Sequence, residues 1–255
     1  MNRFDGAPSR FGNHKVLLTG AASGIGRATA IRLAAEGAHV FGVDRAEEGL
    51  KETAAAVAGP GTFTFRTTDV TDEPAVIETV REAAAELGGI DVLANVAGMH
   101  RTTPIATLSV EDLQELFSVN LVGTALFCRE ALPHLPDRSG VIVNVSSLSA
   151  TQGNPFMSAY AASKAAVLGF SVTLAAEVSG RGIRVVTVSP GSTDTPLVRS
   201  VAFPEGADAG YYARLLAPLG VATPEQIAGT IAYAASADAG YLTGADIRVD
   251  GGAHM

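Results

Sequence analysis

The stretch TGAASGIGRA, residues 19–28, decides the fold, because it joins the apolar segment KVLLTG (15–20) to an alanine-rich segment of helical periodicity. Gly20 permits a tight turn, and Gly24 and Gly26 let the start of the helix approach the sheet and a ligand. Amide groups exposed at a helix N-terminus bind phosphate groups well. An ordinary strand-to-helix turn also contains glycines, but a strand, a glycine turn and a helix in this order favour a nucleotide-binding loop.

Short β-branched segments alternate with longer alanine-rich segments along the chain. The predicted strands span residues 15–20, 38–44, 62–70, 91–98, 140–147, 183–191 and 245–252. The predicted helices span residues 24–37, 46–58, 72–87, 109–135, 158–180 and 224–236. Strands that are apolar on both faces and alternate with helices form a parallel sheet covered on both sides, with right-handed crossovers. We therefore predict an α/β fold, a single Rossmann-like doubly wound domain with a seven-stranded, mostly parallel sheet.

The composition indicates one soluble domain. The chain has 255 residues, so residues 1–255 form one predicted domain, with an N-terminal tail at 1–12. The net charge is −8 and the basic residues are scattered, which argues against nucleic acid or a membrane as a partner. The tail lacks the apolar region of a signal peptide, and we expect a cytoplasmic location. Cys128 is expected to be buried, and no Cys/His cluster indicates a metal.

Polar residues interrupt several predicted strands at their carboxyl ends, the edge at which such sheets bind ligands. They are Asp44, Asp69, Asn95, Ser146, Ser147 and Ser189. Asp44 follows the glycine loop by about twenty residues, where a carboxylate can accept hydrogen bonds from an adenosine ribose and repel a 2′-phosphate. Arg45 could instead hold that phosphate, but Ser23 rather than a basic residue precedes Gly24. We therefore predict NAD rather than NADP as the cofactor.

The stretch MSAYAASKAA, residues 157–166, places Tyr160 and Lys164 four positions apart. In a helix these positions are neighbours on one face, so a phenol and an ammonium group can share a site. Taken alone, the pair fits better a half-buried tyrosine at a packing face and a lysine in solvent. The surrounding motifs decide between the two interpretations.

Taken together, these motifs resemble the short-chain dehydrogenase/reductase family over residues 13–252. The similar motifs are TGAASGIG (19–26), DV (69–70), NVAG (95–98), Asn120 in VNLVG, VNVSS (143–147), Tyr160-x-x-x-Lys164 and PGSTDT (190–195). The resemblance implies that Ser147, Tyr160 and Lys164 are catalytic, with Asn120 as a fourth member. Ser147 stands thirteen residues before Tyr160, as expected for the family, whereas Ser146 points to the opposite face of the strand.

The same resemblance implies contacts with the nicotinamide cofactor. The contacting residues would be Gly20, Ser23, Gly24, Ile25, Gly26, Asp44, Arg45, Asp69, Val70, Asn95, Ala97, Gly98, Tyr160, Lys164, Pro190, Gly191, Thr193 and Thr195. Asp69 and Val70 would flank the adenine, and Lys164 would bind the nicotinamide ribose. The chain departs from the family at Val96, where many relatives carry a second asparagine, and we interpret this as a packing variation.

The implied catalytic residues suit hydride transfer between an alcohol and NAD. A free tyrosine has a pKa of about 10 and is a poor base at neutral pH. A nearby ammonium and a positive nicotinamide ring lower that pKa, so Tyr160 is the predicted general base in oxidation and general acid in reduction. Ser147 would hydrogen-bond the substrate oxygen. By resemblance, Asn120 would support a water that links Lys164 to solvent.

The loop GMHRTTPI, residues 98–105, borders the predicted cleft, where Arg101 could pair with a substrate carboxylate or remain a solvated loop residue. AGMHR, MSAYAASKAA and SPGSTDT resemble the 2,3-dihydro-2,3-dihydroxybenzoate dehydrogenases of siderophore biosynthesis. That implies oxidation of a ring alcohol on a carboxylated cyclohexadiene to an aromatic product. Those enzymes carry an arginine where this chain has Asn154, so a dihydro-3-hydroxyanthranilate remains an alternative. The implied substrate contacts are Arg101, Ser147, Asn154, Met157 and Tyr160.

Further expectations concern the lid, the assembly and competing functions. Residues 196–222 correspond to the family's substrate lid. Its candidate substrate contacts are Arg199, Tyr211, Tyr212 and Arg214. Helices 109–135 and 158–180 imply a homotetramer by analogy. One alternative is another member of the family, such as a 3-oxoacyl reductase or a steroid or sugar alcohol dehydrogenase. The other is a non-catalytic NAD-binding regulator, which would have no need of the four catalytic residues together.

Overall fold

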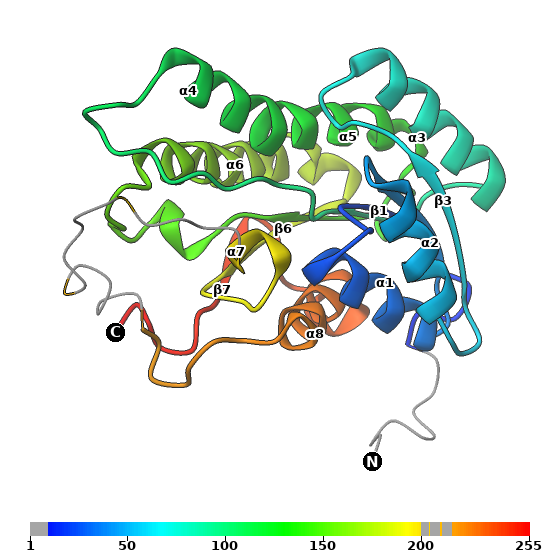
Figure 1. The fold of residues 1–255 in the computed structure, drawn as a ribbon. Helices are drawn as coiled ribbons and strands as arrows, with labels where there is room; N and C mark the ends of the chain where they lie inside the picture. The colour runs from blue at the N-terminus through cyan, green and yellow to red at the C-terminus, as the bar shows by residue number, and fades with distance from the viewer. Residues whose placement is uncertain (1–9, 200–203, 205–209, 211–215) are drawn as a thin grey trace.

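The fold is one parallel β-sheet with helices on both faces (Figure 1). The structure, a computed structural model, describes residues 10–199, 204, 210 and 216–255. Its strands are β1 (Lys15–Thr19), β2 (His39–Asp44), β3 (Thr62–Thr67), β4 (Val92–Asn95), β5 (Val141–Val145), β6 (Arg184–Pro190) and β7 (Ala245–Val249). They lie in the order β3-β2-β1-β4-β5-β6-β7, and every adjacent pair is parallel. The predicted seven-stranded doubly wound α/β fold is confirmed.

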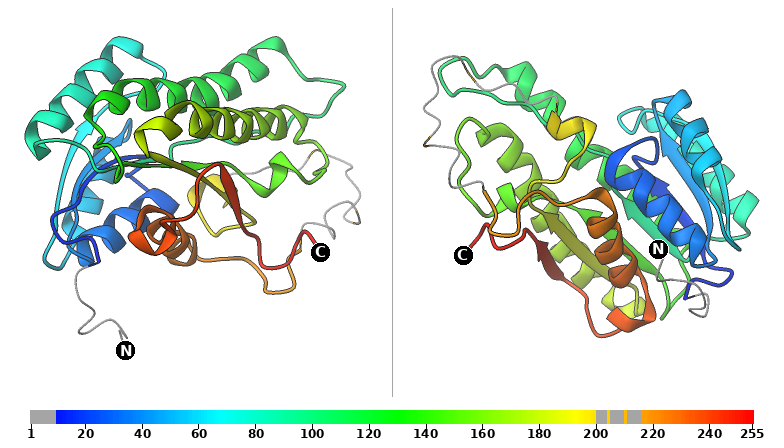
Figure 2. Two further views of the ribbon diagram at one scale, coloured as in Figure 1. Left: turned by 180° about the vertical axis from the view of Figure 1, so that it is seen from behind. Right: turned by 60° about the horizontal axis from the view of Figure 1, so that its bottom comes forward.

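Two layers of helices bury the sheet. The described helices are α1 (Gly24–Ala35), α2 (Glu47–Ala56), α3 (Glu73–Leu87), α4 (Val110–Phe117), α5 (Thr124–Ala131), α6 (Ser158–Val178), α7 (Pro196–Arg199) and α8 (Pro224–Ala235). Helices α1, α2 and α8 cover one face, and α3, α5 and α6 cover the other (Figures 1 and 2). Leu33 and Ile231 belong to the core on the first face, and Phe127 and Leu174 to the core on the second. Burial on both faces explains why the strands are apolar throughout.

The order of the strands changes direction between β1 and β4. From β1 the chain adds β2 and β3 on one side, and β4 then begins the half that runs out to β7. Val16 of β1 is in register with Val40 of β2 and with Val92 of β4. The loops that follow β1 and β4 therefore separate at the carboxyl edge of the sheet and leave a crevice there, the place where such folds bind ligands.

Residues 110–134 form one helical segment, which agrees with the helix predicted over 109–135, but the segment is not α-helical throughout. Helix α4 is followed by the π-helical turn η1 (Ser118–Gly123), then by α5 and the short 3₁₀ turn η2 (Leu132–His134). Asn120 accounts for the interruption, because its side chain accepts a hydrogen bond from the Met99 amide (2.8 Å) and donates one to the Met99 carbonyl (3.1 Å). Such π-turns within helices are frequent at functional sites.

Helix α6 and its continuation, Ser158–Arg181, are long and apolar enough to cross a membrane by length and composition alone. Core helices of soluble proteins meet the same criterion. Leu174, Ala175 and Val178 of α6 are buried in the core beside the sheet, so α6 is a core helix.

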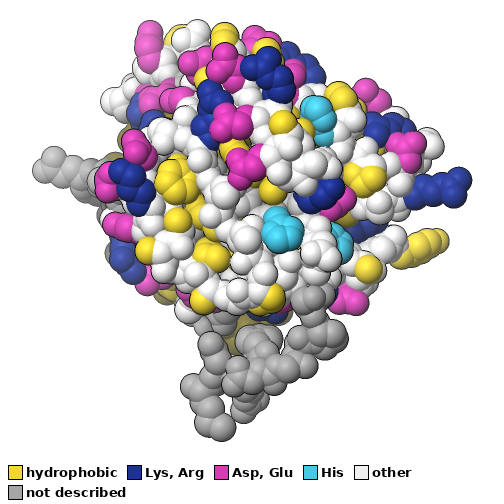
Figure 3. Space-filling view, turned by 90° about the vertical axis from the view of Figure 1, so that its right-hand side faces the viewer, with side chains coloured by type: hydrophobic (Ala, Val, Ile, Leu, Met, Phe, Trp, Pro, Cys, Tyr) yellow, Lys and Arg dark blue, Asp and Glu magenta, His cyan; other side chains and the backbone are white. Residues whose placement is uncertain are grey.

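On the face drawn in Figure 3, Lys and Arg side chains are interspersed with Asp and Glu side chains.

A buried row of polar side chains ties β4 and β5 to α6. Asn95 Nδ2 donates to Asn144 Oδ1 over 2.9 Å, and Asn144 Nδ2 donates to Ser171 Oγ over 2.9 Å. Ser171 Oγ in turn donates to the Val167 carbonyl over 2.7 Å. Because all three polar side chains are buried, their mutual hydrogen bonds replace those with water. The row therefore helps to fix α6, which carries Tyr160 and Lys164, against the sheet.

We expect Asn144→Ala to lower the free energy of unfolding by about 2–4 kcal/mol, because it opens a cavity and leaves the Asn95 amide without its acceptor. Ser171→Ala breaks only the outer bond of the row and should cost about 1 kcal/mol. Urea denaturation of both variants measures the difference. A loss in Asn144→Ala no larger than in Ser171→Ala would contradict this role of the row.

Candidate active site

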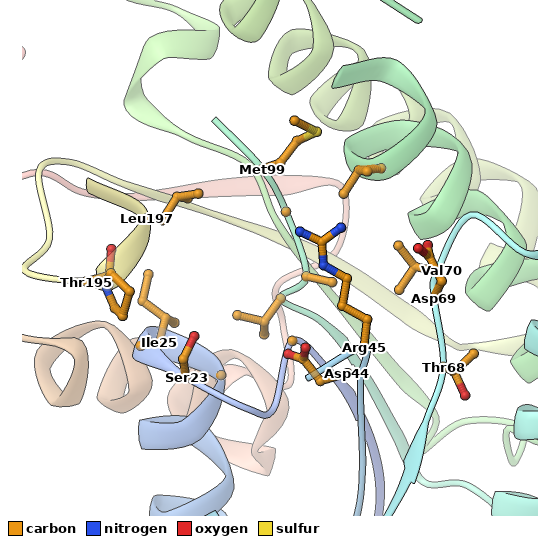
Figure 4. A pocket seen from close by; sticks show the side chains of 18 of the residues that line it. Ser23, Ile25, Asp44, Arg45, Thr68, Asp69, Val70, Met99, Thr195 and Leu197 are labelled. Atoms are coloured by element: carbon orange, nitrogen blue, oxygen red, sulfur yellow. The ribbon is translucent and has the colours of Figure 1, made fainter. Parts of the chain in front are cut away.

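A pocket opens at the crevice beyond β1, β2 and β4 (Figure 4). The predicted cofactor residues that line it are Gly20, Ser23, Gly24, Ile25, Gly26, Asp44, Arg45, Asp69, Val70, Ala97, Gly98 and Thr195. The pocket is completed by Thr68, Val96, Met99, Glu115, Val119, Pro196 and Leu197. Residues from the first, second and fourth strand ends, far apart in the sequence, thus share one cavity.

The glycine loop packs so closely that side chains cannot be added to it. Gly20 has φ +74°, and a Cβ there would lie 2.7 Å from the Ala97 amide nitrogen. A Cβ on Gly26 would lie 1.8 Å from the Gly20 carbonyl oxygen. Ser23, the N-cap of α1, makes no side-chain cap hydrogen bond, so it does not satisfy the first amides of the helix. The tight turn and these amides form a cradle that fits a pyrophosphate.

Two carboxylates and a guanidinium surround the outer part of the pocket. The Asp44 carboxylate accepts hydrogen bonds from the amides of Ala22 (3.1 Å) and Ala46 (3.0 Å). Hydrogen bonds from the backbone and hydroxyl of Thr71, together with the charge of Arg45, hold the pKa of Asp69 below its usual value. Figure 4 shows the Arg45 side chain extending across the pocket from the side of Asp44. This arrangement fits an adenosine, with a ribose next to Asp44.

Tyr160 and Lys164 lie one turn apart on α6 and are 8% and 4% exposed. Lys164 Nζ donates to the Val145 carbonyl of β5 over 3.0 Å, and burial lowers the pKa of Lys164 to about 8. Burial also raises the pKa of Tyr160, which a hydrogen bond with Ser147 opposes. In the protein alone desolvation of the phenolate has the larger effect, and the expected lowering of the Tyr160 pKa by the ammonium together with a nicotinamide ring stays a prediction.

The two adjacent serines at the end of β5 point to different partners. Ser147 interacts with Tyr160, and its Oγ accepts a hydrogen bond from the Ser149 amide over 3.1 Å. Ser146 Oγ instead donates to the Lys164 carbonyl over 2.8 Å. The alternation of side chains along an extended strand separates them in this way. Ser147 thus lies beside Tyr160, where its hydroxyl can contact a substrate, whereas Ser146 binds α6 to the end of β5.

Asn120 joins the π-helical turn to the catalytic helix. It is fully buried, and besides its two bonds to Met99 it donates to Ser163 Oγ over 2.9 Å. A Cβ on Gly98 would lie 3.1 Å from both Asn120 Oδ1 and Lys164 Nζ, so the absence of a side chain at Gly98 lets these two groups come close. The structure therefore gathers Asn120, Ser147, Tyr160 and Lys164 beside the pocket.

Some predicted cofactor residues do not line this pocket. The Asn95 amide points into the core, where Nδ2 also reaches Cys128 Sγ at 3.4 Å. Pro190 ends β6 and Gly191 and Thr193 follow it, with the Thr193 hydroxyl donating to the Gly191 carbonyl over 3.1 Å. Tyr211, Tyr212 and Arg214 of the predicted lid lie outside the described residues, and Arg199 forms an ion pair with Asp194 at 2.7 Å.

The predicted substrate residues have partners within the chain. Arg101 forms ion pairs with Asp112 and Glu115, each at 2.6 Å, and it holds the pKa of Asp112 below its usual value. A substrate carboxylate at Arg101 must therefore compete with two acidic side chains. Asn154 Nδ2 donates to Ser149 Oγ over 2.7 Å, and Met157 packs beside Tyr160.

Sequence reasoning missed His100, whose ring lies 4.6 Å from the Tyr160 ring in an edge-on contact. Its position in the loop after β4 was the signal available. The expected burial of Cys128 is confirmed, and burial raises the pKa of its thiol to about 12. Within residues 10–199, 204, 210 and 216–255, no three His, Cys, Asp or Glu side chains gather as a metal site would require.

The buried ammonium predicts a stability change with pH. Because the folded pKa of Lys164 is about 8 and the unfolded value is about 10.4, the charged lysine costs stability on the order of 3 kcal/mol below pH 8. That cost disappears as the pH rises toward the unfolded pKa. Lys164→Met removes the charge but leaves the Val145 carbonyl unpaired, and should raise the free energy of unfolding at pH 7 by about 1–2 kcal/mol.

Urea denaturation of the wild type and Lys164→Met from pH 7 to pH 10 tests this prediction. The advantage of Lys164→Met should shrink as the pH rises, since only the wild type loses the cost of the buried charge. Other titrating groups are shared by both proteins and cancel in the difference. A pH-independent difference between the two proteins would show that Lys164 keeps an ordinary pKa.

Comparison with known proteins identifies the family. Residues 20–254 match the family described as enoyl-(acyl carrier protein) reductase. The chain is 40% identical over 239 residues to a 3-oxoacyl-acyl-carrier-protein reductase of Thermotoga maritima, covering 92% of this chain and 96% of that protein. It is 41% identical over 247 residues to cis-4-hydroxycyclohexanecarboxylate dehydrogenase of Sinomonas cyclohexanicum, covering 95% and 97%.

Solved structures agree. A short chain dehydrogenase from Burkholderia cenocepacia in complex with NADP has a TM-score of 0.87 at 32% identity, covering 96% of this chain and 100% of that one. One from Mycobacterium paratuberculosis bound to NAD has a TM-score of 0.85 at 29% identity, covering 96% and 98%. The family resemblance is thus confirmed, while the choice between NAD and NADP stays a prediction. The chain belongs to the short-chain dehydrogenase/reductase family and is an NAD(P)-dependent oxidoreductase that acts on alcohol or ketone groups.

Proposed function

We propose that this protein oxidises a secondary alcohol on a carboxylated ring with NAD. In its narrowest form the substrate is a carboxylated cyclohexadiene of the 2,3-dihydro-2,3-dihydroxybenzoate or dihydro-3-hydroxyanthranilate type, which gives an aromatic product. The observation that carries the dehydrogenase assignment is the convergence of Ser147, Tyr160 and Lys164 beside the nucleotide pocket. The similarity to a dehydrogenase named for a hydroxycyclohexanecarboxylate supports the ring and the carboxylate.

The pocket would hold NAD through its glycine loop and Asp44, and bound NAD supplies the hydride acceptor and a positive ring near the catalytic residues. Ser147 Oγ would donate a hydrogen bond to the substrate oxygen while accepting one from the Ser149 amide. Tyr160 would take the hydroxyl proton of the substrate, and Lys164 would stabilise the resulting phenolate. Because burial raises the pKa of Tyr160, the tyrosine rests as a phenol and needs added positive charge to ionise.

A cluster of apolar side chains beside Tyr160 is suited to contact the carbon atoms of a substrate ring. Tyr160 clusters with the buried Leu116 and Ala159, and the partly buried Met99 and Met157 pack against them. At the rim, Arg101 is 40% exposed at its side chain and could exchange Glu115 for a substrate carboxylate. The reacting carbon would then sit between apolar side chains, with the charged group toward the rim.

Two other functions compete with this proposal. A 3-oxoacyl reductase is favoured by the 40% identity to such an enzyme, and Asp44 argues against it, because a carboxylate repels the 2′-phosphate of NADP. A steroid or sugar alcohol dehydrogenase shares the same catalytic residues. A non-catalytic NAD-binding regulator would have no use for the assembled Asn120, Ser147, Tyr160 and Lys164.

We also infer a homotetramer formed through the α4–α5 and α6 segments. Val122 of the π-helical turn and Val172 of α6 are 45% and 47% exposed, as expected of apolar residues that a second subunit covers. A substrate lid at residues 196–222 and a cytoplasmic location complete the proposal. Only parts of that lid lie within the described residues.

The substrate is tested with NAD and matched alcohols, followed by the absorbance of the reduced cofactor. We expect turnover of 2,3-dihydro-2,3-dihydroxybenzoate and of cis-4-hydroxycyclohexanecarboxylate, with weaker turnover of cyclohexanol. Tyr160→Phe should lower kcat by about 100-fold or more while leaving NAD binding intact. Reduction of a 3-oxoacyl thioester with NADPH, without oxidation of any ring alcohol, would favour the reductase instead.

The cofactor preference is tested at Asp44. We expect kcat/KM to be higher with NAD than with NADP, and Asp44→Asn to reduce that preference by about tenfold, because it removes the charge and keeps one acceptor oxygen. Arg45→Ala is the matched variant, and it should lower activity with NADP only. Equal use of both cofactors by the wild type would contradict the assignment of NAD.

A further inference from the structure

Buried polar atoms that lack a hydrogen-bond partner gather on two loops beside the catalytic residues. Among the described residues they include His100 Nε2, Thr102 Oγ1, Thr103 Oγ1 and Asn154 Oδ1. A hydrogen bond of 2.7 Å from the Thr103 amide to the Phe156 carbonyl joins the two loops, 98–105 and 151–157. Proteins pair nearly all buried polar atoms with other protein groups or with water, so a group of unpaired ones is a place that water or the polar groups of a ligand can occupy.

His100 is the member of this group nearest to the chemistry. Its ring meets the Tyr160 ring at 4.6 Å between centroids, with an interplanar angle of 64°. Burial lowers the pKa of His100 below its usual value, so the imidazole is neutral at pH 7. A neutral imidazole with its proton on Nε2 donates one hydrogen bond there. In that tautomer the imidazole would present a donor beside the Tyr160 ring.

Asn154 is linked to the catalytic serine through one intermediate residue. Its Nδ2 donates to Ser149 Oγ over 2.7 Å, and the Ser149 amide donates to Ser147 Oγ over 3.1 Å. These bonds fix the orientation of the Asn154 amide and leave its Oδ1 as an acceptor without a donor. A substrate group that contacted both side chains would donate to the amide oxygen and accept from the imidazole, as a hydroxyl can.

The group of buried unpaired atoms differs in charge from the rim of the site, where Arg101 lies. The only cation of loop 98–105 is Arg101, and its two ion pairs with Asp112 and Glu115 neutralise it. Burying a carboxylate against neutral donors would cost much more than burying a hydroxyl that finds both partners. The buried atoms thus favour an uncharged oxygen.

We propose that His100 and Asn154 are specificity-determining residues that bind a second hydroxyl of the substrate, on the carbon next to the reacting one, so that the substrate is a vicinal diol. This inference rests on the proposed oxidation of a ring alcohol, and it adds the residues that recognise the second hydroxyl and favours the 2,3-dihydroxy substrate over the amino-substituted alternative. The carboxylate, where present, stays at the rim near Arg101.

The test compares cyclohexane-1,2-diol with cyclohexanol, which differ by that hydroxyl alone. In the wild type we expect kcat/KM to be about tenfold or more higher for the diol, the effect of satisfying one buried polar group. His100→Phe keeps a ring against Tyr160 but removes the nitrogen, and should lower kcat/KM for the diol by about tenfold while leaving cyclohexanol within about threefold. His100→Gln, which retains a donor, should recover part of the loss.

Asn154→Ala gives a second variant, with the same selective loss expected, and binding of the reduced cofactor confirms that each variant is folded. An equal loss for both alcohols, or an unchanged ratio, would overturn the inference and leave the proposed function intact. If the wild type oxidised cyclohexanol in preference to the diol, the inference would also be overturned and the proposed function would also remain. A wild type that oxidises no ring alcohol at all would overturn the proposed function, and this inference with it.

Discussion

The hydrogen bond from Lys164 Nζ to the Val145 carbonyl is the constraint on which the rest of the site depends. Lys164, which is only 4% exposed, lies one turn from Tyr160 on α6 and bonds to the last residue of β5. A buried charge lowers the free energy of unfolding. The hydrogen bonds from Asn95 through Asn144 to Ser171 help to hold α6 in place despite that cost. The buried charge of Lys164 therefore makes the fold less stable, but it places an ammonium group where it can favour ionisation of the Tyr160 phenol.

One stretch of backbone serves both the nucleotide pocket and the catalytic residues. Ala97 packs against the glycine loop at Gly20, and Gly98 packs against Asn120 and Lys164. Neither contact tolerates a larger residue at the glycine without displacement of a neighbour. The loop after β4 thus contacts both the glycine loop and the catalytic residues. A shift of that loop would therefore move both parts of the site. This explains why Asn120 holds Met99 with two hydrogen bonds.

Local patterns predicted the fold, and the family resemblance implied the catalytic residues, whereas tertiary contacts decided the rest. The alternation of strands and helices, the glycine loop and the spacing of Tyr160 and Lys164 are all visible within short windows. The π-helical turn at Asn120 is not, because the hydrogen bonds of Asn120 reach Met99, which is distant in the sequence. The ion pairs of Arg101 and the inward amide of Asn95 likewise depend on partners from other elements. The sign of the pKa shift of Tyr160 follows from burial, which no motif records.

Specificity in this framework lies in the loops rather than in the sheet. Relatives named as a 3-oxoacyl-acyl-carrier-protein reductase, a meso-2,3-butanediol dehydrogenase and a D-threitol dehydrogenase are 40%, 36% and 39% identical to this chain, so overall identity does not separate their named substrates. What distinguishes one substrate is the set of polar atoms that the protein leaves unpaired near the reacting carbon, because an analogue that cannot satisfy them pays the full cost of their burial. In this chain those atoms belong to His100 and Asn154, on two loops joined by one backbone hydrogen bond.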